Sequence, residues 1–249
     1  MRAWIPAHAL GAVVWRKLLV GRADARAFVE QGIVPLLVRL KVECTQATGH
    51  PSRPVLAHGG YRLAHTKRDG DVDRIVMDLW AELKTDGEVL GRVYGEDVFT
   101  RVRAPAGQRK VTELPVVGLP DERAAQPGPA HLLELPAGAE ALDDAFVCDA
   151  IDVLMSTDHS DLNQHVNSLV YPELMAEAGL RRLVSHGVDH GMLVRSFEVC
   201  FRKPMFAGQT ASMYIRSFRL GASYGVCAAI VPLGEGVDAK PYATAQIGW

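Results

Sequence analysis

The polar residues best suited to chemistry gather in one short segment of the chain: Asp158, His159, Asp161, Asn163, His165 and Asn167. Carboxylate, amide and imidazole groups can orient water and move protons. A helix pattern follows this segment, and a helix N-terminus offers free N–H groups to an oxyanion. Asp and Asn are also favoured as helix caps regardless of function. Four polar residues at alternate positions exceed what a cap requires, so the pattern favours a functional site.

The C-terminal half must position this segment between a strand and a helix. Residues 145–155 are rich in Val, Ile, Phe and Leu, which predicts a strand. Apolar residues spaced by four predict a helix from Val166 to about Leu183. Alternating segments at 192–203, 210–220 and 222–232, with a short one at 243–247, predict further strands.

The N-terminal half shows the same order more loosely. The apolar stretch 7–44, interrupted at 21–24, is interpreted as helical. Strands are expected near 60–65, 73–84 and 89–102, with a hairpin at Thr85-Asp86-Gly87 because glycine adopts positive φ readily. Two halves with one order of elements suggest a duplicated α+β unit.

A segment rich in Pro and Gly separates the two halves. Residues 104–142 contain Pro105, Pro115, Pro120, Pro127, Pro129 and Pro136. Such a composition disfavours both a helix and a central strand, so it predicts an extended linker. The expected domains are 1–110, a linker at 111–142, and 143–249.

The motif Asp161-Leu-Asn-Gln-His-Val-Asn-Ser168, followed by Tyr171 and Glu177, resembles the D-x-N-x-H-V-N-N…Y motif of hotdog-fold acyl thioesterases. The nearest resemblance is to the acyl-acyl-carrier-protein thioesterases, which carry two hotdog domains in tandem. The segment Phe201-Arg-Lys-Pro-Met-Phe-Ala-Gly208 resembles a second family pattern. The resemblance covers residues 145–249, and the first half carries no copy of the motif.

This resemblance implies a tandem hotdog fold, in which each unit is a long helix wrapped by an antiparallel sheet. It also implies hydrolysis of an acyl thioester carried by coenzyme A or acyl carrier protein. Asp161 would activate water or attack the carbonyl, Asn163 would fix the substrate or water, and His165 would support the charge shift. N–H groups at Val166, Asn167 and Ser168 would polarise the carbonyl, and Tyr171 and Glu177 would help to bind the substrate.

The motif departs from the family at Ser168, where the family has a second Asn. Arg202 stands near the place of an acid that plant-type enzymes carry on the strand after the helix, with Glu198 nearby. Two alternatives therefore remain open. One is a hydratase or dehydratase of the same fold, and the other is a non-catalytic module that binds acyl chains or a partner.

Composition excludes several classes of protein. Lys plus Arg number 27 and Asp plus Glu 29, a balance that gives no support for nucleic-acid binding. No apolar run reaches the length of a membrane span. The cysteines lie far apart without metal-ligand spacing, at Cys44, Cys148, Cys200 and Cys227, so we expect reduced thiols and no metal. We also expect no cofactor and a cytoplasmic location. Pairing of hotdog units through sheet edges leaves a homodimer open.

Overall fold

The computed structural model describes residues 4–15, 25–47, 52–161 and 164–249. They fall into two compact units, and along the chain the division lies between Pro127 and Gly128. Unit 1 contains α1 (Trp4–Leu10), η1 (Gly11–Trp15), α3 (Ala25–Glu30), β1 (Ile33–Cys44), β2 (Leu56–Arg68), β3 (Asp71–Thr85), β4 (Glu88–Arg101) and η2 (Ala106–Gln108). Unit 2 contains η3 (Pro129–Leu133), β5 (Glu140–Ala141), β6 (Val147–Cys148), β7 (Val153–Leu154), η4 (Thr157–His159), α4 (Val170–Ser185), β8 (Ser196–Phe201), β9 (Thr210–Leu220), β10 (Ser223–Pro232) and β11 (Ala243–Gly248).

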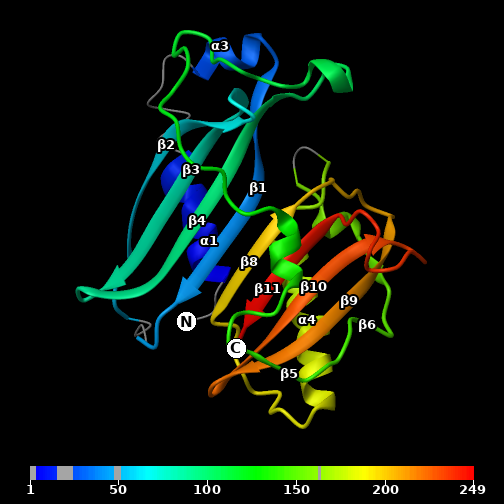
Figure 1. Ribbon diagram of the computed structural model, residues 1–249. Helices are drawn as coiled ribbons and strands as arrows, with labels where there is room; N and C mark the ends of the chain where they lie inside the picture. Colours follow the sequence, from blue (N-terminus) through cyan, green and yellow to red (C-terminus); the bar gives the residue numbers. More distant parts are fainter. Residues whose placement is uncertain (1–3, 16–24, 48–51, 162–163) are drawn as a thin grey trace. The chain divides into compact units, whose positions relative to one another are not determined.

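In unit 1, four antiparallel strands follow the order β2-β3-β4-β1, and α1 lies against one face of this sheet (Figure 1). Odd-numbered residues of β3, such as Met77 and Leu79, are buried on the helix side. Gly95 of β4 lies at the contact, where an added Cβ would stand 3.1 Å from Leu10 Cδ2. The absence of a side chain there lets the helix approach the sheet closely.

In unit 2, the long antiparallel strands follow the order β8-β11-β10-β9, and the short strands β5, β6 and β7 pair with β9. α4 packs on this sheet through Gly179, where an added Cβ would lie 2.8 Å from Val226 Cγ2. Each unit therefore consists of helix packed on antiparallel sheet, and the expected α+β class is confirmed.

The helix expected over 7–44 is wrong in its last part, because residues 33–44 form β1. The strand alternates buried Leu40 and Val42 with exposed Lys41 and Glu43. Its first half carries apolar residues on both faces, and such a run cannot be told from a helix by periodicity alone. The strand expected over 145–155 is reduced to β6 and β7, two short pairings with β9.

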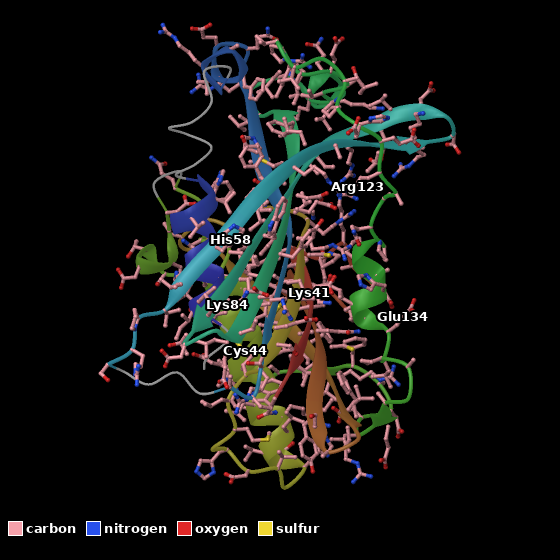
Figure 2. The ribbon with its side chains drawn as sticks, turned by 90° about the vertical axis from the view of Figure 1, so that its left-hand side faces the viewer. Lys41, Cys44, His58, Lys84, Arg123 and Glu134 are labelled. Atoms are coloured by element: carbon pink, nitrogen blue, oxygen red, sulfur yellow. The ribbon has the colours of Figure 1, made fainter. Side chains whose placement is uncertain are left out.

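The Pro- and Gly-rich segment is bound closely to the sheets. Before the division at residue 127, the His65 N–H donates to the Asp121 carbonyl, and the Arg123 N–H donates to that of His65. After it, the carbonyl of Pro129 accepts a hydrogen bond from Thr244 Oγ1. The side chain of Arg123 reaches from this segment toward the sheet of unit 1 (Figure 2).

Asp97 is the most unusual buried group of unit 1. It lies on the helix side of β4, opposite Met77 of β3 and Leu37 of β1, and it is 0% exposed. None of the described residues makes a hydrogen bond to either carboxyl oxygen. Burial, with a smaller contribution from Glu96, raises the pKa of Asp97 to about 7.

We predict that the unfolding free energy decreases as pH rises through the interval from 3.8 to about 7. In that interval the unfolded chain releases the Asp97 proton while the native chain retains it, so higher pH favours unfolding, by at most about 4 kcal/mol. Denaturant titrations across this range should show that Asp97→Asn removes the decrease. The exposed Asp71→Asn serves as control, and an unchanged pH profile in Asp97→Asn would contradict the assignment.

Candidate active site

The polar segment of unit 2 is a loop built by its own hydrogen bonds. It begins with η4, where the Ser156 N–H donates to His159 Nδ1 at 3.1 Å and the His159 N–H donates to the Ser156 carbonyl. Ser160 then pairs with Val166 as an isolated antiparallel bridge. Because this bridge joins the two sides of the loop, Asp161, Gln164 and His165 lie beyond it, at the tip.

Asp161 and His165 close the tip. The Asp161 N–H donates to the His165 carbonyl at 2.8 Å, and the Gln164 N–H donates to the Asp161 carbonyl at 3.0 Å. Gln164 has a φ of 63°, the left-handed conformation that a tight turn requires. The turn exposes Asp161 and leaves His165 half-buried, edge-on to Phe206 with ring centroids 5.1 Å apart. Asn163, the third predicted catalytic residue, lies outside the described residues.

α4 begins at Val170, four residues later than the pattern indicated, with Pro172 tolerated in its first turn. The Val166 N–H donates to the Met205 carbonyl and the Asn167 N–H to the His159 carbonyl, so neither is open to a substrate oxygen. Asn167 Oδ1 accepts a hydrogen bond from the Leu169 N–H. The Ser168 N–H makes no backbone hydrogen bond to another described residue.

Tyr171 joins the start of α4 to the turn that follows β8. Its ring is buried against Phe201, and its hydroxyl oxygen accepts a hydrogen bond from the Met205 N–H at 3.0 Å. Burial raises the pKa of Tyr171; the Met205 N–H opposes this rise, and the negative charge of Asp161 adds to it. Tyr171 therefore ties the first turn of α4 to the Met205 backbone, close enough to Asp161 to be influenced by its charge. Glu177 is exposed and about 10 Å along the helix axis from Val170.

The acid sought on the strand after the helix does not join this loop. Phe197 and Val199 of β8 are buried in the core, so the alternation of the strand places Glu198 on the opposite face. Glu198 Oε1 there lies 3.6 Å from His131 Nε2. Arg202 follows the strand and is exposed. No sequence signal indicated the His131 contact, because His131 lies in the segment interpreted as a linker.

The far end of α4 is fixed by a buried carboxylate, Asp143. Arg182 Nε lies 3.0 Å from Asp143 Oδ1, His186 Nε2 lies 2.9 Å from the same atom, and the Ser217 N–H donates to Oδ2 at 2.8 Å. Burial alone would raise the pKa of Asp143, but Arg182, Ser217 and His186 hold it at about 2. α4 is therefore tied to β9 at one end and to the Met205 turn at the other.

Two further findings limit the chemistry in the described part of the chain. No group of three or more His, Cys, Asp or Glu side chains there could hold a metal ion. None of the helices described has the length and apolar character needed to cross a membrane.

No protein-family model matches the chain, and no curated protein matches it. Solved structures do. An acyl-ACP thioesterase from Bacteroides thetaiotaomicron aligns over 99% of this chain and 88% of its own, with a TM-score of 0.58 and 14% identity. A 12:0-ACP thioesterase from Umbellularia californica aligns over 98% and 87%, with a TM-score of 0.60 and 14% identity. At these identities the likeness shows the fold, and the expected tandem hotdog fold is confirmed.

We predict that Tyr171→Phe lowers the unfolding free energy by about 1–2 kcal/mol, because the buried Met205 N–H loses its acceptor. Denaturant unfolding measures this change. Tyr224→Phe is the matched control, since its hydroxyl makes no hydrogen bond to the residues described. Equal stability of the two variants would show that the Tyr171 contact does not hold the loop to α4.

Proposed function

We propose that the protein hydrolyses an acyl thioester, with the acyl group carried by coenzyme A or acyl carrier protein, and that Asp161 is its central catalytic group. The observation that carries the proposal is the turn in which Asp161 and His165 share a backbone hydrogen bond directly before α4. That turn presents an exposed carboxylate and a half-buried imidazole shortly before the N-terminus of α4. The fold shared with acyl-ACP thioesterases supports the same choice of substrate class.

The residues present are sufficient for a simple hydrolysis. Asp161 accepts a proton from water as the water oxygen bonds to the carbonyl carbon. The carbonyl oxygen becomes an oxyanion, which the Ser168 N–H and the positive end of α4 stabilise. Collapse of this intermediate breaks the carbon–sulfur bond, and the thiolate leaves with the proton that Asp161 had taken. Water thus supplies one hydrogen to the thiol and its hydroxyl to the carboxylic acid.

His165 supports this step from the other side of the turn. Its ring is held edge-on to Phe206, and its carbonyl is fixed by the Asp161 N–H. An imidazole in this place stabilises the changing charge on the carboxylate without itself contacting the carbonyl carbon. A thioester needs no stronger nucleophile, because the thiolate is a good leaving group.

We predict that Asp161→Asn lowers the rate of thiol release about 100- to 1,000-fold, since the base that activates water is lost. A panel of short-, medium- and long-chain acyl-coenzyme A and acyl-carrier-protein thioesters would be tested with a thiol-reactive dye. Asp158→Asn is the matched control, because it changes an exposed acid of the same loop three positions away. Its rate should stay within about twofold of the wild type.

Thermal melting would confirm that each variant is folded. Release of thiol that is lost in Asp161→Asn and kept in Asp158→Asn establishes the thioesterase. If the folded wild-type protein releases no thiol from any thioester, the proposal fails. Water addition to an enoyl thioester, followed by the loss of ultraviolet absorbance, would then identify a hydratase, and acyl-chain binding without turnover would identify a non-catalytic module.

A further inference from the structure

Unit 1 carries a cavity on the face of its sheet opposite α1. The cavity measures about 390 Å³ and is lined by Arg62, Asp78, Trp80, Tyr94, Arg123 and Gln126. These residues come from β2, β3, β4 and the Pro- and Gly-rich segment, all within unit 1. The volume is within the range of small-molecule sites. The proposed hydrolysis uses none of these residues.

Trp80 forms an ordered aromatic wall of this cavity. It pairs with Gly60 of β2, and an added Cβ at Gly60 would lie 2.8 Å from Trp80 Cζ2. One side of the indole ring is therefore pressed against the β2 backbone. The residue is nevertheless 42% exposed, so the rest of the ring remains accessible. A fixed, partly exposed indole is suited to stacking against a flat ring.

The charges of the cavity are arranged by depth. Asp78, whose side chain is 4% exposed, accepts hydrogen bonds from Tyr94 Oη at 2.6 Å and Arg62 Nη2 at 2.8 Å, and it is paired with Arg123 at 3.0 Å. Arg123 is also paired with Glu96. The carboxylates thus lie at the bottom, where three donors share Asp78. The side chain of Arg62 is 62% exposed at the mouth.

Several hydrogen-bond donors that line the cavity have no partner in the network around Asp78. Arg62 binds Asp78 through Nη2, and no described residue engages its other N–H groups. Gln126 lines the same cavity with an exposed side chain. Arg123 Nε is buried and has no hydrogen-bond partner among the described residues. A guanidinium fork and an amide beside an indole ring match a flat ring that carries an anionic group, because Arg binds carboxylate and phosphate through paired N–H groups.

We propose that this cavity binds a small ligand made of a planar ring with an anionic group. The ring stacks on Trp80, and the anion accepts hydrogen bonds from Arg62 and Gln126. Tyr94 and Asp78 orient Arg62 from below and do not contact the anion. Aromatic carboxylates and nucleotide monophosphates share this chemistry, and the two sources are distinguished by experiment.

The test titrates the full chain with sodium benzoate and, separately, with adenosine 5′-monophosphate, using calorimetry and tryptophan fluorescence. We expect saturable binding of one probe or both, and Arg62→Gln should weaken it at least about tenfold. Gly60→Ala should weaken it as well, without a change in charge, because the new methyl group displaces the Trp80 ring. Binding of benzoate alone identifies a carboxylate site, and binding of the nucleotide alone identifies a phosphate site.

Arg92→Gln is the matched control. Arg92 is 61% exposed, is paired with Glu82 on the same face of the sheet, and does not line the cavity. It should change the affinity by less than about twofold. The proposal is overturned if neither probe saturates below about 10 mM, or if Arg62→Gln and Arg92→Gln have equal effects. No thioester is present in this test, so its result is independent of the proposed hydrolysis.

Discussion

The site in unit 2 depends on the two hydrogen bonds made by the Met205 backbone. Its carbonyl accepts from the Val166 N–H, and its N–H donates to the Tyr171 hydroxyl oxygen. Met205 is fully buried, so neither bond is replaced by water. Together they fix the strand-like end of the loop and the first turn of α4 to one point after β8. The Asp161 turn is held at the start of α4 because Val166, which follows the turn, and Tyr171, in the first helical turn, both bond to Met205.

Two buried aspartates show how differently the fold treats the same group. Asp143 is surrounded by Arg182, His186 and the Ser217 N–H, and its pKa is held at about 2. Asp97 faces apolar neighbours, and its pKa is raised to about 7. The first stabilises the ionised form and anchors α4. The surroundings of Asp97 oppose its ionisation. Burial of even a neutral carboxyl group without a hydrogen-bond partner costs free energy, so packing alone does not explain the presence of Asp97 in unit 1.

The sequence predicted the parts whose signals are local. Period-two alternation correctly predicted β9 and β10, and the Thr85–Gly87 turn correctly joined β3 to β4. It failed where both faces of a strand are apolar, as in β1. The sequence also could not place Met205 at the site, since its backbone N–H donates to the hydroxyl of Tyr171, a residue 34 positions away. Asp161 and His165 were predicted to lie together by their spacing, and the turn brings them together, whereas their catalytic roles remain predictions.

The segment between the halves shows why a linker prediction misses function. Its composition disfavours a long helix and a central strand, but it does not indicate which part of the sheets the segment covers. In unit 2 the segment is held largely by its own carbonyls, with Glu134 O accepting from Gln246 Nε2 at 2.7 Å. In unit 1 backbone hydrogen bonds with His65 also hold the segment, and the charged side chain of Arg123 adds ion pairs to Asp78 and Glu96 (Figure 2). A hydrogen bond to a backbone carbonyl brings the backbone of the segment close to the sheet. A long arginine side chain can reach the sheet from a backbone that lies farther away. The cavity beside Trp80 lies where that arginine reaches the sheet, so its polar lining follows from the way the segment is attached.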